Sequence, residues 1–163
     1  EVIVLLDGDD KFYHDRVLER LNKAYNDERV WMTYGSDTSK LVKRSHSRPT
    51  PVSILKEAKC RTMPWGWSHL RTFYAGLFKK IPAEKLQKDG KFFRVGWDIG
   101  MMFSLMELSR EHTFFIPDIL YWYNTDNPIC DFKVHLRNQQ RVRRYVWAQE
   151  PLEGLSSRED FLQ

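Results

Sequence analysis

Three carboxylates stand within four positions near the start of the chain, at Asp7, Asp9 and Asp10, which we call the acidic trio. Asp7 and Asp9 alternate along the backbone and can share one face, while Gly8 between them lets the main chain approach a ligand closely. Carboxylates so crowded repel one another unless a cation neutralises them. The pattern therefore predicts an oxygen-ligated site for Mg²⁺ or Mn²⁺ that bridges to phosphate. The alternative is an acidic turn that caps the following segment.

A fourth carboxylate, Asp98, stands between Trp97 and an apolar run, at the start of a predicted helix over residues 98–109. A carboxylate at a helix N-terminus can accept hydrogen bonds from the backbone and still face a cleft, where partial desolvation would tune it as a general base. The alternative is an ordinary helix N-cap.

Three indoles, at Trp65, Trp67 and Trp97, lie beside glycines and polar turns. Their flat faces suit sugar rings or nucleobases, although core packing is the alternative for each of them. His69 and Arg71 fall on the first turn of a predicted helix and could contact an anion there.

The pattern of apolar residues predicts the elements that position these side chains. Residues 2–6 are a wholly apolar, β-branched run that is typical of a buried strand, and open α/β sheets bind ligands at the carboxyl ends of such strands. An amphipathic helix over 14–26 and a strand over 29–34 complete a β-α-β unit, which predicts parallel pairing. Further on we expect a long surface loop over 37–61, a helix from Ser68 to Ile81, the buried helix over 98–109 and a strand over 113–123 with an edge or bulge at Pro117.

The composition sets limits on the class of protein. A chain of 163 residues, 42% hydrophobic and 14% aromatic, is most simply a single domain. Because no apolar run approaches about 20 residues, we expect no transmembrane segment. Two cysteines are too few for a disulfide framework or a zinc site. The net charge of +4 favours an anionic partner. We expect a cytoplasmic protein, with peripheral attachment to a membrane left open, and no nucleic-acid partner.

The separate motifs together resemble a known enzyme family. The acidic trio follows an apolar strand and precedes a helix, a strand and a long loop. Next come Trp-Gly-Trp-Ser-His-Leu-Arg and then Gly-Trp-Asp, which stands directly before a buried helix. Over residues 2–127 this order is similar to the second half of an inverting family 2 glycosyltransferase of the GT-A fold. The family carries a nucleotide-binding half before the acidic motif, so we expect this chain to lack its N-terminal part.

The resemblance implies a three-layer α/β/α fold with a mainly parallel sheet in a single domain over 1–163, in which 132–163 form a basic helix and tail. It implies that Asp7 and Asp9 hold Mn²⁺ or Mg²⁺, that the acidic trio binds a nucleotide-diphosphate sugar donor, and that Asp98 is the catalytic base. The acceptor, a free glycan or one linked to lipid or protein, would contact Trp67, Trp97 and His69. The family usually has Glu where this chain has Trp97.

Other classes of protein share parts of this pattern. An apolar strand that ends in Asp-x-Asp also opens haloacid-dehalogenase-like phosphatases, but those need a small hydroxyl residue shortly after the motif, where this chain has Lys11 and Phe12. A non-catalytic remnant of a glycosyltransferase, binding glycan or protein through its indoles, is the other alternative.

Overall fold

The computed structural model describes residues 1–45 and 47–162, without the side chains of residues 131 and 132. The strands are β1 (Val2–Leu5), β2 (Lys11–Phe12), β3 (Met32–Thr38), β4 (Ser68–Tyr74), β5 (Gln87–Lys88), β6 (Lys91–Phe92) and β7 (Thr113–Trp122). The α-helices are α1 (Val17–Tyr25), α2 (Val52–Lys56), α3 (Ala75–Lys79), α4 (Trp97–Ser109), α5 (Asp131–Val134), α6 (Leu136–Trp147) and α7 (Glu159–Leu162). Short 3₁₀ turns are η1 (Lys59–Thr62), η2 (Ala83–Leu86) and η3 (Arg110–His112).

The main sheet has the strand order β1-β4-β3-β7-β2 and is mixed. β4 lies between β1 and β3 and is antiparallel to both, β7 is parallel to β3, and β2 is antiparallel to β7. The predicted parallel pairing of the first two long strands is therefore wrong, because a strand from later in the chain separates them. The expectation of a mainly parallel sheet is wrong for the same reason, whereas the mixed α/β class is confirmed.

Strand β4 replaces the first half of the helix predicted to begin at Ser68. Its side chains alternate between the two faces, so that Leu70 packs in one apolar cluster and Phe73 in the other. Thr72 pairs across the sheet with Thr33, their hydroxyl oxygens 2.6 Å apart. The apolar residues of this segment fit a helical period as well as alternation, and the β-branched, cross-strand partners decide in favour of the strand.

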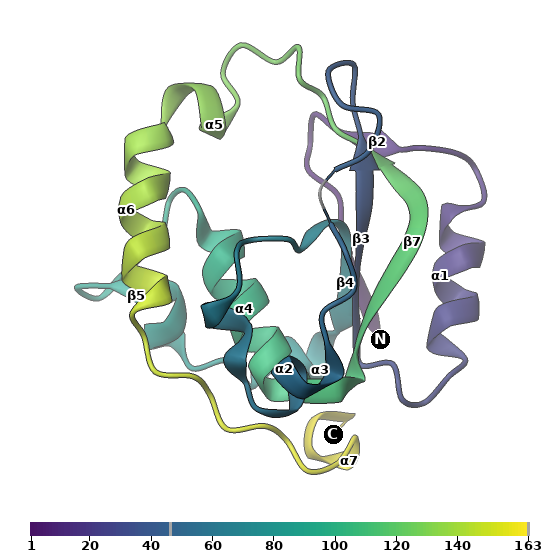
Figure 1. Cartoon of the computed structure of the whole chain (residues 1–163), viewed down its shortest axis with the longest axis vertical. Helices are drawn as coiled ribbons and strands as arrows, with labels where there is room; N and C mark the ends of the chain where they lie inside the picture. The colour runs from purple at the N-terminus through teal and green to yellow at the C-terminus, as the bar shows by residue number, and fades with distance from the viewer. Residues whose placement is uncertain (46, 163) are drawn as a thin grey trace.

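Helices cover both faces of the sheet (Figure 1). α1 packs Val17 and Leu21 against one face, in a cluster with Leu70 and Leu120. On the other face α4 is buried at every position from 100 to 109, and α6 packs against it. The predicted amphipathic helix over 14–26 and the predicted buried helix over 98–109 are both confirmed in type, with bounds shifted by a few residues.

Strand β7 is irregular at Pro117, as predicted. Tyr34 of β3 is opposite Phe115, and Ser36 is opposite Ile119, so residues 116–118 face a single residue of β3. The irregularity is a bulge against β3, and it also lies along an edge, since β2 pairs with β7 only at Tyr121 and Trp122 and no other described strand pairs with that side of β7. The basic helix expected within 132–163 is divided at His135 into α5 and α6.

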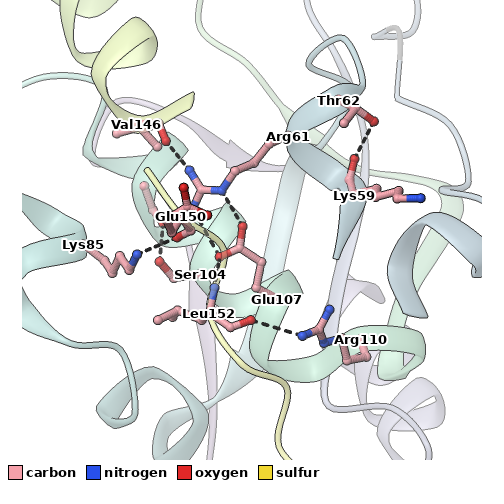
Figure 2. Close-up of polar contacts among 11 residues, drawn as sticks. Lys59, Arg61, Thr62, Lys85, Ser104, Glu107, Arg110, Val146, Glu150 and Leu152 are labelled. Carbon is pink, nitrogen blue, oxygen red and sulfur yellow. Dashed lines mark hydrogen bonds and ion pairs between the residues drawn. The ribbon is translucent and has the colours of Figure 1, made fainter. Parts of the chain in front are cut away.

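A buried ion pair ties the C-terminal segment to the core (Figure 2). Arg61 Nε donates to Glu107 Oε1 at 2.6 Å, and the exposed fractions of the two side chains are 8% and 0%. Arg61 also donates to the carbonyl oxygen of Val146, the penultimate residue of α6. The backbone N–H of Leu152 donates to the second Glu107 oxygen at 2.9 Å. These contacts fix the position of α6 against α4.

Candidate functional site

A cavity of about 330 Å³ opens at the carboxyl end of β1, where the acidic trio lies. Segments far apart in the sequence form its wall: the turn after β1, strand β4, the start of α4, the segment after β7 and one residue of α6. The lining residues are Leu5, Asp7, Asp9, Asp10, His69, Arg71, Gly96, Trp97, Asp98, Tyr123, Asn127, Ile129, Cys130 and Gln139. All the residues that the resemblance assigns to the site therefore line this cavity except Trp67.

Asp10 is held by the protein through both carboxylate oxygens. The hydroxyl of Tyr121, a fully buried residue of β7, donates to Oδ2 at 2.5 Å, and the backbone N–H of Asn124 donates to Oδ1 at 2.7 Å. The Tyr121 hydroxyl also accepts a hydrogen bond from the backbone N–H of Asp7 at 3.3 Å. Asp10 thus anchors the acidic turn to β7 and the segment after it.

Asp7 and Asp9 are less engaged. Within residues 1–45 and 47–162, no hydrogen bond reaches the Asp7 carboxylate, and Asp9 accepts one at Oδ2 from the side-chain amide of Asn127, at 2.5 Å. Partial burial raises the pKa of Asp7, and repulsion from Asp10, Asp98 and Asp9 adds to this rise, while Arg71 opposes it. The charged form of Asp7 is therefore less favoured here than in water.

Asp98 forms an ion pair with Arg71, whose Nη1 lies 2.9 Å from Asp98 Oδ2. The Arg71 side chain is 6% exposed and the Asp98 side chain 30% exposed. Arg71 is opposite Leu5 in the β1–β4 register, which places its guanidinium beside the end of β1. Asp98 lies in the first turn of α4, where the helix N-terminus favours its negative charge. Gly96, with φ +66°, supplies the left-handed backbone that brings the chain into this helix.

His69 and Trp97 complete the predicted set at the cavity. The His69 ring stacks on Tyr121, with centroids 4.3 Å apart and planes at 21°. Burial lowers the pKa of His69 well below its usual value, and the nearby positive charge of Arg71 lowers it further. The imidazole is therefore neutral at pH 7 and can offer one donor and one acceptor. Trp97 lines the same cavity and is 41% exposed.

Trp67 does not reach the cavity, which corrects its predicted contact with an acceptor. Its side chain is 2% exposed and packs edge-on against Phe103, with ring centroids 5.4 Å apart. Its Nε1–H donates to Thr50 Oγ1 at 2.8 Å. The indole that the sequence placed beside a glycine is thus part of the core, and its neighbour Trp65 lines a second cavity instead.

The structure adds site residues that sequence reasoning missed. Arg71 was expected to contact an anionic ligand but is the partner of Asp98, and Tyr121 is the anchor of Asp10. Asn127 and Gln139, from the segment after β7 and from α6, also face the cavity. A tyrosine and two amides carry no spacing signal, because their roles depend on the pairing of β7 with β3 and on the packing of α6 against α4.

The donor set of the acidic trio suits a hard divalent cation that also binds a phosphate. Asp7 and Asp9 offer carboxylate oxygens, and Mg²⁺ commonly takes one or two carboxylates with water and substrate phosphates as its other ligands. Over the described part of the chain, no group of three or more His, Cys, Asp or Glu side chains is arranged to hold a metal by itself. These residues therefore fit a cation shared with a ligand better than a closed structural site.

Comparison with known proteins adds no assignment. No protein-family model matches the chain, and no curated protein resembles it in sequence closely enough to count as a relative. Among the described residues, no helix combines the length and the apolar character that a membrane span requires.

Proposed function

We propose that this chain is the catalytic part of a metal-dependent glycosyltransferase that moves a sugar from a nucleotide-diphosphate donor to a hydroxyl acceptor with inversion. The observation that carries the proposal is the meeting of Asp7, Asp9 and Asp98 in one cavity of about 330 Å³. A pair of carboxylates suited to a cation and a separate carboxylate suited to a base are the two functions that such a transfer needs. The resemblance to family 2 and the GT-A fold is part of this proposal, supported by a sheet covered by helices on both faces.

In the proposed reaction, Asp98 removes the proton from the acceptor hydroxyl. Arg71 holds Asp98 Oδ2, which leaves Oδ1 to take that proton as the hydroxyl oxygen bonds to the anomeric carbon. The bond from that carbon to the diphosphate breaks on the opposite side, so the configuration inverts. A Mn²⁺ or Mg²⁺ ion held by Asp7 and Asp9 would neutralise charge on the departing diphosphate. Asp10 contributes by fixing the turn that carries both ligands.

Binding of the donor is the first test. Mn²⁺ binding is measured from the loss of the free-ion electron paramagnetic resonance signal, alone and with UDP, GDP, UDP-sugars and GDP-sugars. We expect a nucleotide diphosphate to tighten Mn²⁺ binding, and Asp9→Asn to weaken it by about tenfold or more, since a charged ligand is lost. Asp15→Asn, the same change at an exposed position outside the cavity, is the matched control. A chain that binds Mn²⁺ no better with any nucleotide than without one would contradict the proposal.

Catalysis is tested separately by release of nucleoside diphosphate from the donor that binds, with water as acceptor. Asp98→Asn should keep donor affinity and lower turnover by about 10²- to 10⁴-fold, the contribution of a general base. Hydrolysis of a small phosphoester that survives Asp98→Asn but is lost in Asp7→Asn would identify a phosphatase instead.

A further inference from the structure

A second cavity, of about 260 Å³, adjoins the first and meets it at Asp98. The two cavities share Gly96, Asp98 and Gln139. The second is completed by Trp65, Ile99, Leu136, Gln140 and Arg143, none of which lines the first. The carboxylate of Asp98 therefore lies between a space that contains the acidic trio and a space that does not.

The wall of the second cavity is suited to a sugar. Trp65 is half-buried and is fixed by neighbouring rings, with centroids 5.5 Å from Trp67 and 6.1 Å from Trp147. An indole held in this way offers an apolar surface for the C–H groups of a pyranose ring. Gln139 and Gln140 add amide groups that can donate to and accept from hydroxyls.

The charge of the second cavity differs from that of the first. Arg143 lines it, and its guanidinium lies 4.6 Å from the centroid of the Trp147 ring. Across the described residues, no carboxylate forms an ion pair with Arg143. Asp98 is the one carboxylate among the described lining residues, and Arg71 already neutralises it. The second cavity is thus positive, whereas the first holds the acidic trio.

The positive surface continues along α6 away from the cavity. Gln139, Arg143 and Trp147 are spaced four residues apart and so lie along one face of the helix. Arg143 and Trp147 also line a shallow hollow with Arg144 and Ala148. A ligand longer than one sugar could follow this face from Asp98 outward.

We propose that the second cavity is the acceptor subsite and that it selects a saccharide bearing a negative group, a carboxylate or a phosphate ester, which pairs with Arg143. The inference rests on the proposed glycosyl transfer, because a base must touch the acceptor hydroxyl while the donor lies on its other side. The acidic trio would repel an anionic acceptor from the first cavity, and Arg143 would attract it to the second.

The test uses trigalacturonate as the anionic probe and its fully methyl-esterified form as the neutral match, with mannose 6-phosphate as the phosphate-bearing probe. Binding is followed by two-dimensional ¹H–¹⁵N NMR of the complete chain with Mg²⁺ and UDP present. We expect an anionic probe to shift the Trp65 indole N–H signal and to bind at least fivefold more tightly than the neutral ester. Arg143→Gln should remove this preference, and Arg141→Gln, a matched change on α6 that lines neither cavity, should keep it.

The outcomes separate this inference from the proposed function. Equal binding of trigalacturonate and its ester, or no binding of any anionic probe, would overturn the inference while Mn²⁺-dependent binding of UDP is unaffected. Weaker binding of UDP in Arg143→Gln would also overturn it, because Arg143 would then serve the donor diphosphate. Conversely, the chain could bind no nucleotide and still bind the anionic probe more tightly than its neutral ester in an Arg143-dependent way. That result would support the anionic saccharide site and refute the proposed glycosyl transfer. Trp65→Phe, which keeps an aromatic ring, should weaken both saccharides equally if Trp65 contacts the ring.

Discussion

Removal of the buried charge at Glu107 should destabilise the whole domain and loosen α6, the helix whose Gln139 lines both cavities. In Glu107→Gln the shape of the side chain stays nearly the same, but Arg61 loses its ionic partner while its side chain remains 8% exposed. Breaking a buried pair by neutralising one member costs about 3–5 kcal/mol. That is a large part of the ~5–15 kcal/mol that stabilises a typical domain.

The magnitude can be tested by urea unfolding followed through tryptophan fluorescence, since Trp147 lies at the end of α6. For a chain of this size the cost corresponds to a melting temperature lower by about 6–20 °C. The double replacement Arg61→Met with Glu107→Leu should recover most of the loss, because an apolar pair of similar volume avoids the uncompensated charge.

A matched control is available in the exposed pair of Lys56 and Glu111, whose charged atoms are 3.8 Å apart. Glu111→Gln should change the free energy of unfolding by less than about 0.5 kcal/mol. If Glu107→Gln were to match that control, Arg61 and Glu107 would not form a buried pair, and the account of how α6 is fixed would fail.

Three further predictions concern the acidic trio and its neighbours. Tyr121→Phe removes the hydroxyl that donates to Asp10, and should lower the free energy of unfolding by about 1–3 kcal/mol in the same urea assay; no change would mean that this bond is absent. Because the pKa of Asp7 is raised, the stability that its protonated form contributes to the fold is lost as the pH rises above 3.8. Without metal, Asp7→Asn should therefore melt at a higher temperature than the wild type at pH 7. That advantage should shrink toward pH 4, and saturating Mn²⁺ should reverse it. Because the pKa of His69 is lowered, the stability that its neutral form contributes to the fold is lost as the pH falls below 6.5, by up to about 1.4 kcal/mol per pH unit. His69→Gln should therefore flatten that slope in urea unfolding measured at a series of pH values.

The elements that the sequence predicts well are those whose local residue pattern is compatible with one kind of structure only. Residues 98–109 leave almost no polar face, which is compatible with a buried helix, and α4 is buried from 100 to 109. Pro117 cannot donate to the sheet, and β7 has its bulge there. The acidic trio follows a wholly apolar run, and it lies at the carboxyl end of β1 as expected.

The elements that the sequence does not predict depend on contacts between distant segments. Leu70, Phe73 and Tyr74 fit a helical stripe locally, and only pairing with β1 and β3 makes residues 68–74 a strand. Trp67 stands beside a glycine and a serine, which suggests exposure. It is instead packed against Phe103 in the core and donates a hydrogen bond to Thr50, which lies in the long segment between β3 and α2. No local pattern contains either piece of information.

The insertion of β4 between β1 and β3 is also what brings the candidate base to the candidate cation site. In a parallel β1–β3 pair, the strand beside the acidic turn would have been β3, which carries no arginine. In the observed sheet, Arg71 of β4 is opposite Leu5, two residues before Asp7, and its guanidinium reaches across to Asp98 at the start of α4. One buried cation thus pairs with Asp98 and also opposes the charge repulsion at Asp7. The predicted sheet was wrong and the role of Arg71 was missed for one reason. Arg71 can pair with Asp98 beside the acidic trio only because the antiparallel strand β4 separates β1 from β3.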